Sequence, residues 1–269
     1  MKVWRKVPYL KAPGLQQMVL DNWLFDRLIA EHSQKHSQNL SQPILRFYSW
    51  SPPAISLGYH QHKIPEHWAD LAKAEGLDLV RRPSGGRAVL HKGDLTYAVI
   101  LKADQGARRA TYTHICGFLI QGLASLGIEL SYGSAGRGYI HHPSCFSTAT
   151  NADLVIADGR KLIGSAQVYR SGFVLQHGAI ALQPDYVLLR QIFGEDVPVV
   201  GLSELLPNSN ESLVDRLIDS LTRSAADHFD AEFVEMSFEL MNATFADRDT
   251  TLPTLKEGFP NNNQSRSLG

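Results

Sequence analysis

Cysteine is scarce in this sequence, and neither sign of charge is in excess. The 269 residues contain two cysteines, Cys116 and Cys145, and 26 basic side chains stand against 27 acidic ones. Two cysteines are too few for the disulfide framework that holds small secreted proteins together. The formal net charge of −1 is not the footprint of a nucleic-acid-binding protein, so we expect no nucleic-acid partner.

Long apolar runs are also absent. The sequence has no stretch of about 18 consecutive apolar residues, so we expect no membrane-spanning segment and no membrane partner. Residues 1–8 carry positive charge without the apolar stretch of a secretory signal peptide. The pairs His60/His62 and His141/His142 lack a third ligand at metal-binding spacing, so we expect no metal and no cofactor. These absences together predict a soluble cytoplasmic protein.

The apolar and aromatic residues that are present predict a mixture of helices and strands. Helices are expected over residues 15–31, 65–75, 112–123 and 211–228, strands over 44–50, 54–59, 77–80 and 172–182, and a hairpin over 154–163. Because these elements do not alternate regularly, we expect an α+β fold with a mixed or antiparallel sheet packed with helices. Residues 1–247 are predicted to form a single domain, followed by a polar tail over 248–269.

A glycine pair flanked by arginines is the first feature with chemical potential. The segment RRPSGGRAVLH at residues 81–91 contains Gly85-Gly86, where backbone N–H groups can approach a ligand closely. The arginines Arg82 and Arg87 can bind a carboxylate or a phosphate. The spacing matches neither a Walker loop nor a dinucleotide fingerprint, and the pattern alone is equally consistent with a tight turn between two strands.

The two cysteines occupy different sequence contexts. Cys116 lies in the apolar stripe of the helix expected over residues 112–123, so we assign it to the core. Cys145 follows a glycine-rich segment and lies outside any apolar periodicity. A thiolate is a strong nucleophile, but it forms readily only where a nearby cation or dipole lowers the thiol pKa. The pattern alone therefore leaves Cys145 as either a buried, inert thiol or a nucleophile.

A lysine and a histidine lie in and beyond the predicted hairpin. If the turn has two residues, Lys161 pairs with Ile156 and shares a face with Leu154 and Ile163. A lysine held against apolar residues is desolvated, which lowers its pKa, although the same position suits a snorkelling lysine at an exposed hairpin end. His177 can serve as a general base, as a hydrogen-bond donor or as a satisfied core residue.

Several motifs occur together in a fixed order. They are LRFYSWSPP at residues 45–53, SLGYHQ at 56–61, RRPSGGRAVLH at 81–91, DLTYAV at 94–99, GRKLIGSAQ at 159–167 and LQHG at 175–178. Together these motifs resemble the biotin/lipoate protein ligase superfamily over about residues 15–182. Within it, the sequence most resembles the cysteine-dependent octanoyltransferases of lipoyl assembly, which act on the glycine cleavage H protein. The resemblance implies the catalytic-domain fold of the biotin/lipoate ligases.

The resemblance also implies a reaction and the residues that perform it. Cys145 matches the family's nucleophile, and Lys161 matches the lysine that lowers the pKa of that nucleophile. The enzyme would transfer an octanoyl group from octanoyl acyl carrier protein to a lysine of a lipoyl-domain protein, such as the glycine cleavage H protein. The transfer would pass through a thioester on Cys145 and would need no ATP.

Substrate contacts are implied at the motif residues. The Gly85-Gly86 loop or residues 164–165 would hold the thioester oxyanion, and residues 89–99 would line a slot for the octanoyl tail. The full set of expected acyl- and substrate-binding residues is Arg82, Ser84, Gly85, Gly86, Arg87, His91, Gly164, Ser165, Ala166, Gln167, His177 and Gly178.

Three other functions remain open from the sequence. ATP-dependent lipoate–protein ligases share most of these motifs, but they need no cysteine, often have a third glycine where Arg87 stands, and carry an extra C-terminal domain. About 40 residues follow His228, too few for a stable separate domain. An amidotransferase that moves the acyl group between carrier proteins uses the same thioester chemistry. A non-enzymatic module would bind a fatty acid without turnover, and the Cys145/Lys161 pair argues against it.

Overall fold

A mixed β-sheet forms the centre of the computed structural model, which describes residues 1–33, 42–103, 108–133, 153–194, 196–206 and 212–237. Its strands are β1 (Lys2–Ala12), β2 (Ile44–Trp50), β6 (Asp94–Lys102), β7 (Ser131–Tyr132), β8 (Asp153–Val155), β9 (Lys161–Arg170), β10 (Phe173–Ala181) and β11 (Ala231–Glu235). In space they follow the order β11-β1-β2-β6-β10-β9-β8-β7. The pairs β1–β11 and β1–β2 are parallel, and the other pairs are antiparallel. The predicted fold class is confirmed.

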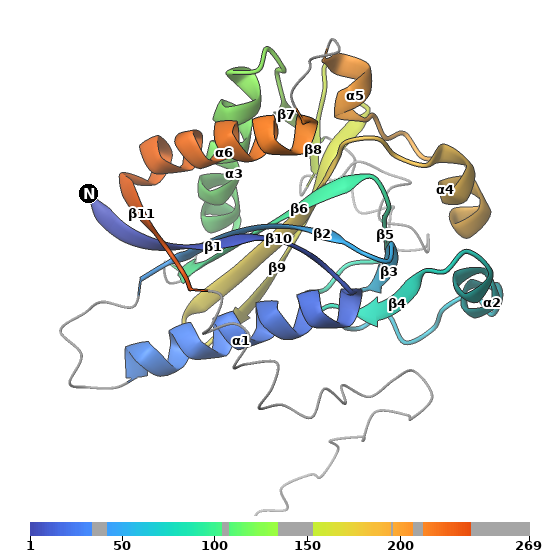
Figure 1. Ribbon diagram of the computed structural model, residues 1–269, viewed down its shortest axis with the longest axis horizontal. Helices are drawn as coiled ribbons and strands as arrows, with labels where there is room; N and C mark the ends of the chain where they lie inside the picture. The colour runs from blue at the N-terminus through green and yellow to red at the C-terminus, as the bar shows by residue number, and fades with distance from the viewer. Residues whose placement is uncertain (34–41, 104–107, 134–152, 195, 207–211, 238–269) are drawn as a thin grey trace, which may run out of the picture.

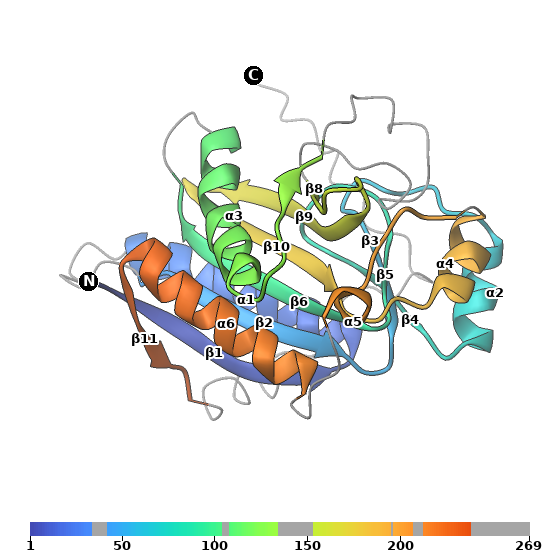
Figure 2. The same ribbon diagram turned by 90° about the horizontal axis from the view of Figure 1, so that it is seen from above.

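Helices cover both faces of this sheet. Helix α1 (Gly14–Ser33) lies along one face, and helices α3 (Arg108–Ala124) and α6 (Leu213–Phe229) lie across the other (Figures 1 and 2). The central strands β2 and β10 are consequently buried along their whole length, which explains their nearly continuous apolar and aromatic sequences. None of the helices in the described part of the chain has the length and apolarity needed to cross a bilayer.

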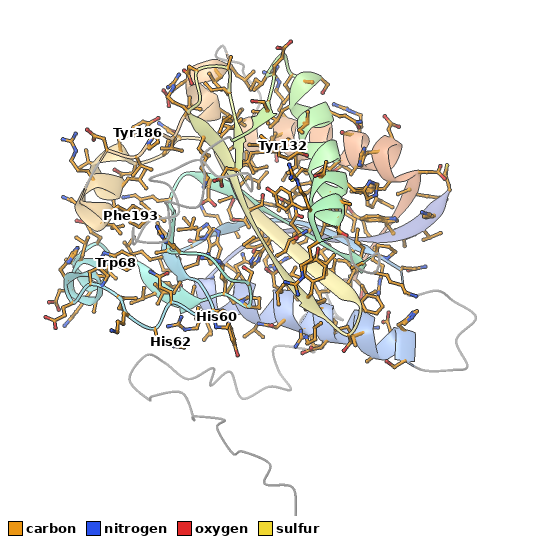
Figure 3. All side chains as sticks on the ribbon, turned by 180° about the vertical axis from the view of Figure 1, so that it is seen from behind. His60, His62, Trp68, Tyr132, Tyr186 and Phe193 are labelled. Atoms are coloured by element: carbon orange, nitrogen blue, oxygen red, sulfur yellow. The ribbon has the colours of Figure 1, made fainter. Side chains whose placement is uncertain are left out.

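A smaller sheet lies beside one end of the large one. It consists of β3 (Ala54–Leu57), β4 (Asp78–Arg81) and β5 (Val89–His91), in the order β4-β3-β5. The short helices α2 (His67–Ala74) and α4 (Tyr186–Phe193) lie near it, and α5 (Leu202–Leu205) follows later in the chain. Trp68 of α2 meets Phe193 of α4 edge to face, and its indole N–H donates to the Ile192 carbonyl at 2.7 Å (Figure 3). The segment between β4 and β5 is the glycine-pair loop.

Several elements were not expected from the sequence, among them β1 and α4. Strand β1 contains Pro8, and a register shift between Val7 and Leu10 in its pairing with β2 accommodates a residue that cannot donate to the ladder. Helix α4 has recognisable ends, because the Asp185 carboxylate accepts from the Leu188 N–H at 2.9 Å and Gly194 adopts a left-handed conformation after the last turn. The predicted helices and strands otherwise appear within a few residues of their expected bounds, and β2 matches its prediction at both ends.

The hairpin that carries Lys161 has a different register from the one expected. Lys161 pairs with Val155 instead of Ile156, and the ladder shifts before Leu154 pairs with Ile163. One extra residue in β9 reverses the face on which Lys161 lies. Its side chain therefore shares the face of Asp153 and Gly164, and the expectation that it shares the face of Leu154 and Ile163 is wrong.

Candidate active site

A cavity of about 940 Å³ lies among α1, β4 with the loop that follows it, and β9. This volume is typical of small-molecule sites in proteins. Its lining residues are Pro13, Leu15, Met18, Asn22, Tyr59, His60, Asp78, Leu79, Val80, Arg81, Arg82, Pro83, Gly85, Arg108, Gln167, Val168, Tyr169 and Arg170. Of the residues predicted to bind the acyl group or substrate, Arg82, Gly85 and Gln167 are in this lining. The cavity combines aliphatic side chains with several arginines, which suits an apolar chain attached to a polar or anionic group.

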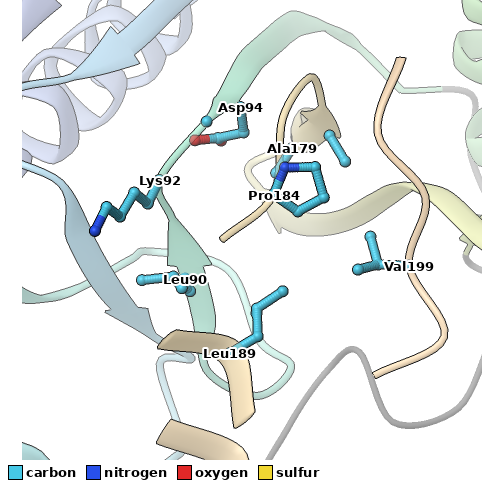
Figure 4. A pocket seen from close by; sticks show the side chains of 9 residues that line it. Leu90, Lys92, Asp94, Ala179, Pro184, Leu189 and Val199 are labelled. Carbon is cyan, nitrogen blue, oxygen red and sulfur yellow. The ribbon is translucent and has the colours of Figure 1, made fainter. Parts of the chain in front are cut away.

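The strands that were expected to form the acyl slot do not line this cavity. Leu90 and Asp94 instead border a separate space of about 20 Å³ beside Leu189 and Val199 (Figure 4). Such a space holds about one water molecule. Of residues 89–99, none lines the large cavity, whose walls come from α1, β4 and β9.

The two arginines before the glycine pair hold backbone carbonyls. Arg81 donates through Nη1 to the carbonyls of Gly58 (2.7 Å) and Gln61 (2.8 Å). Arg82 is buried, and its Nη2 donates to the carbonyls of Gly85 (2.8 Å) and Arg87 (2.6 Å). Charge-assisted bonds of this kind are among the stronger hydrogen bonds in proteins. Arg82 therefore helps to set the conformation of the glycine loop, and Arg81 holds the neighbouring segment from Gly58 to Gln61.

The Gly85-Gly86 loop presents backbone donors. Gly86 has a φ of 92°, and a Cβ built on the neighbouring Gly58 would lie 1.8 Å from the Gly86 carbonyl oxygen. The loop thus needs glycine both for its conformation and for the close approach of Gly58. Within the described ranges, the N–H groups of Gly85 and Gly86 donate to no other residue, while the Gly85 carbonyl accepts from Arg82. An anionic oxygen is the kind of ligand that such donors bind.

The predicted catalytic lysine forms a buried ion pair. The Lys161 Nζ lies 2.6 Å from the Asp153 Oδ1, and both side chains are almost fully buried. A Cβ built on Gly164 would lie 2.7 Å from that Nζ, so the absence of a side chain at Gly164 makes room for the ammonium group. Gly164 pairs with Ala179 on β10, two residues beyond His177. Because alternate residues of a strand share a face, Lys161 and His177 lie on the same side of the sheet.

A chain of hydrogen bonds joins the glycine loop to helix α1. Ser84 Oγ lies 2.5 Å from His177 Nε2, and His177 Nδ1 lies 3.1 Å from Asp21 Oδ2. The Asp21 carboxylate also forms an ion pair with Arg46 and accepts from the Tyr48 hydroxyl at 2.9 Å. All five side chains are buried. Sequence reasoning identified Ser84 and His177 but missed Asp21 and Arg46.

The charge states of Asp21 and His177 define which atoms donate along this series of hydrogen bonds. Burial raises the pKa of the Asp21 carboxyl, but Arg46 foremost, and then His177 and Tyr48, offset it and leave that pKa below its ordinary value. Burial lowers the pKa of His177, Arg82 and His91 lower it further, and Asp21 offsets this only in part, so the pKa lies below its ordinary value. Asp21 is therefore an ionised acceptor and His177 a neutral imidazole. His177 must then donate from Nδ1 to Asp21 and accept at Nε2 from the Ser84 hydroxyl.

His91 belongs to a second buried network. Its Nδ1 lies 2.8 Å from Asp94 Oδ2, its Nε2 lies 2.9 Å from Ser56 Oγ, and its ring stacks on Trp50 with centroids 4.0 Å apart. The Ser56 hydroxyl also accepts from Arg82 at 3.2 Å. Both ring nitrogens of His91 are thus engaged with protein groups, and the structure places this residue behind the loop, outside the lining of the large cavity.

Ser165 and Gly178 face the opposite side of the sheet. The Tyr97 hydroxyl lies 2.8 Å from Ser165 Oγ and accepts from Gln176 Nε2 at 2.8 Å. A Cβ built on Gly178 would lie 2.6 Å from Ser165 Oγ, so this glycine is required for the packing there. Ala166 pairs with His177 and shares its face. The predicted substrate-binding residues of β9 and β10 are therefore divided between the two faces.

Cys116 lies in the apolar core, as predicted. The residue is fully buried in the cluster under α3 and α6, where burial raises the pKa of its thiol to about 11. A thiol with that pKa is almost entirely protonated at neutral pH, which makes it a poor nucleophile. Cys145, His141 and His142 lie outside the described residues, as do residues 248–269 of the predicted tail.

The residues that sequence reasoning missed share one signal. Arg46 stands between apolar residues in a predicted strand, and a charge that is buried among such residues requires a partner. Asp21 has the same context in α1. The rule predicts that each residue has a counter-charge, but only the fold shows that the two are paired with each other.

These observations define a mixed-sheet enzyme domain with an arginine-lined cavity, a glycine loop and a buried lysine, and comparisons place that domain in a family. The lipoyl protein ligase A/B catalytic domain matches residues 15–226, and the chain belongs to this family. The chain is 34% identical to an octanoyltransferase LipM of Symbiobacterium thermophilum, over 80% of this chain and 78% of that protein. It is 29% identical to an octanoyltransferase LipM of Clostridioides difficile, over 87% and 90% of the two chains.

Solved structures show the same fold. A lipoate-protein ligase A bound with ATP superimposes with a TM-score of 0.71 at 20% identity, covering 92% of this chain and 96% of the other. A bi-partite lipoate protein ligase from Thermoplasma acidophilum gives a TM-score of 0.66 at 22% identity, covering 92% and 94%. At these identities the likeness concerns the fold, and it confirms the resemblance seen in the sequence motifs.

Proposed function

We propose that this octanoyltransferase moves the octanoyl group from a carrier-protein thioester to a protein lysine, through a thioester on Cys145. The predicted reaction class is confirmed by the curated relatives, which share the name octanoyltransferase LipM. The observation that carries the mechanistic part is the buried Lys161–Asp153 ion pair at 2.6 Å. A buried ammonium group is what a thiolate nucleophile requires as its counter-charge.

The first half-reaction forms the acyl-enzyme. The Cys145 thiolate attacks the carbonyl carbon of the donor thioester, and the carbonyl oxygen becomes a tetrahedral oxyanion. The N–H groups of Gly85 and Gly86 are the candidates to bind this oxyanion. The bond from the carbonyl carbon to the donor sulfur then breaks, and the leaving thiolate takes a proton from the Lys161 ammonium. The products are octanoyl-Cys145 and the free carrier thiol.

The second half-reaction forms the amide. An acceptor lysine amine attacks the octanoyl-Cys145 carbonyl, again through an oxyanion. As the carbon–sulfur bond breaks, the cysteine leaves as a thiolate, and the proton lost by the amine returns to Lys161. This step yields the amide product and returns Cys145 and Lys161 to their original charge states. The cycle therefore needs no ATP.

The large cavity supplies a place for the octanoyl tail. Leu15 and Met18 of α1, Val80 of β4 and Val168 of β9 give it aliphatic walls. About seven buried carbons at ~0.8 kcal/mol each contribute on the order of 5 kcal/mol to binding. This term favours a medium chain but discriminates only modestly for each added carbon.

The proposed partners are two carrier proteins. The donor is octanoyl acyl carrier protein, whose acidic character matches the arginines that line the cavity, Arg108 and Arg170 among them. The acceptor is a lipoyl-domain protein, for which we propose the glycine cleavage H protein as one example. The solved Thermoplasma acidophilum ligase is described together with its E2 lipoyl domain, which agrees with an acceptor of this class.

Intact-mass measurement tests the central step. The protein is mixed with octanoyl acyl carrier protein without ATP, and we expect an octanoyl adduct that hydroxylamine removes. Cys145→Ala should form no adduct, whereas Cys116→Ala should acylate normally and serves as the matched control, because Cys116 is buried in the core. If Cys145→Ala transfers octanoate normally but only with ATP, the protein is a ligase and the thioester mechanism is wrong.

A further inference from the structure

We propose that Asp21, His177 and Ser84 are positioning residues that hold the Gly85-Gly86 loop in place as the oxyanion donor. This inference rests on the proposed function, because it assigns the loop a role in thioester chemistry. The bonds of the chain run from Ser84 Oγ to His177 Nε2 at 2.5 Å and from His177 Nδ1 to Asp21 Oδ2 at 3.1 Å.

The chain connects parts of the molecule that are distant in sequence. Ser84 belongs to the loop after the small sheet, His177 to a central strand of the large sheet, and Asp21 to helix α1. His177 and Asp21 are themselves fixed, since β10 pairs on both sides with β6 and β9, and Asp21 forms a fully buried ion pair with Arg46. The Ser84 hydroxyl therefore anchors the glycine loop to the large sheet and, through His177, to helix α1.

Other hydrogen bonds of the loop hold its backbone carbonyl groups. The Ser84 carbonyl accepts from the Tyr59 N–H at 2.9 Å, and the Gly85 carbonyl accepts from Arg82. With the carbonyls bound on one side and the Ser84 side chain bound on another, the peptide planes of the glycine pair have little freedom to rotate. Oxyanion donors must be held in their productive orientation before the reaction.

The three residues have the order of a nucleophilic triad, but their surroundings fit a different role. Ser84 is fully buried and does not line the cavity, although its neighbours Pro83 and Gly85 do. Arg46 compensates the charge of Asp21, so Asp21 stabilises an imidazolium less than an unpaired carboxylate would. A serine that substrate cannot touch acts through the loop it belongs to.

Two rates separate positioning from a general structural effect. Acylation by octanoyl acyl carrier protein passes through an oxyanion, whereas alkylation of the catalytic thiol by iodoacetamide displaces iodide and forms none. In single-turnover experiments we expect Ser84→Ala to slow acylation about 10- to 100-fold, below or near the effect of deleting one oxyanion donor. The alkylation rate and the KM for the donor should stay within about twofold of wild type.

Matched variants complete the test. Ser220→Ala removes another buried hydroxyl with a 2.8 Å hydrogen bond, to the Gly122 carbonyl between α3 and α6, and should leave both rates unchanged. His177→Gln keeps an acceptor for Ser84 and should retain more acylation than His177→Ala. This comparison tests the same role if Ser84→Ala folds poorly.

The outcomes that overturn the inference are distinct from failure of the proposed function. Wild-type acylation in Ser84→Ala, or equal slowing of acylation and alkylation, removes the positioning role. An acyl adduct mapped to Ser84 would make it a nucleophile and would overturn both proposals. A normal adduct in Cys145→Ala overturns the proposed function alone.

Discussion

Asp21 and Arg46 form an ion pair in which neither side chain reaches solvent. Arg46 also donates from Nη1 to the Gln17 carbonyl at 3.2 Å, and its guanidinium lies 4.0 Å from the centre of the Tyr48 ring. The pair joins helix α1 to strand β2, and its Asp21 also contacts His177, which bonds Ser84 of the glycine loop. A buried charge pair is sensitive to the loss of one partner, because the remaining charge is left without compensation.

The first prediction concerns this pair. Arg46→Met leaves the Asp21 carboxylate with only Tyr48 and His177, and we expect a loss of about 3–5 kcal/mol in the free energy of unfolding. Urea denaturation followed by circular dichroism measures it. Arg160→Met, which removes a solvent-exposed partner of Asp158, is the control and should change the stability little. Equal effects of the two substitutions would contradict the assigned role of burial.

The second prediction is a pH dependence of stability caused by His177. Burial holds its pKa in the folded protein below the ordinary value of about 6.5 that it regains on unfolding. Below pH 6.5 the unfolded chain therefore binds a proton that the folded chain does not, so stability falls as the pH decreases, by up to about 1.4 kcal/mol per unit. The fall ends at the folded-state pKa.

Urea denaturation at pH 5 to 8 measures this effect. The carboxyls with lowered pKa values, such as those of Asp21 and Glu31, lose their stabilising effect only as the pH falls below their ordinary values of about 4. The window from pH 6.5 to 5 thus isolates histidine. His177→Gln should flatten the profile in that window, and an unchanged slope in this variant would assign the pH dependence to another group.

The residues above show that secondary-structure elements can be predicted from the sequence, whereas contacts between distant residues cannot. The strand with Arg46, the helix with Asp21 and the loop with Ser84 were all predicted as elements, because apolar spacing and glycine placement are local properties. The Ser84–His177 and His177–Asp21 bonds join residues 93 and 156 positions apart. No local pattern encodes such contacts, so the sequence could indicate that Ser84 and His177 matter without showing that they touch.

Lys161 shows the same limit within a single hairpin. The hairpin was predicted, but its turn closes between Ile156 and Arg160, one residue longer than the assumed two-residue turn. Lys161 therefore pairs with Val155 instead of Ile156, and an extra residue in β9 then restores the expected pairing of Leu154 with Ile163. Because side chains alternate along a strand, that single shift moved the lysine to the other face of the sheet. Asp153, the counter-charge of Lys161, could not be identified from the sequence for this reason.

The third prediction tests the space that Gly164 leaves for Lys161. In Gly164→Ala the added Cβ would lie 2.6 Å from Lys161 Cε and 2.7 Å from Nζ. The lysine end is flexible, so the fold should persist while the ammonium group is displaced. We expect the pKa of the Cys145 thiol to rise and its alkylation by iodoacetamide at pH 7 to slow, as in Lys161→Ala.

Gly117→Ala provides the matched control for Gly164→Ala. Its Cβ would lie 2.3 Å from the His228 ring, at the contact between α3 and α6. It therefore imposes a comparable clash away from the site and should leave the pH profile of alkylation unchanged. If Gly164→Ala also leaves that profile unchanged, Lys161 does not set the pKa of the nucleophile.

The fourth prediction concerns the length of the acyl chain. Val80 of β4 and Val168 of β9 both line the large cavity, so a larger side chain at Val168 shortens the space available to the acyl tail. Each methylene that no longer fits loses ~0.8 kcal/mol, about a fourfold change in relative affinity. Val168→Trp should therefore shift acylation from octanoyl toward hexanoyl and butanoyl carrier protein, measured by intact mass in mixtures of the three donors. Leu90→Met, which alters the 20 Å³ space instead, should keep the octanoyl preference. A shift in Leu90→Met but not in Val168→Trp would place the acyl tail along β5 and β6, as the sequence first indicated.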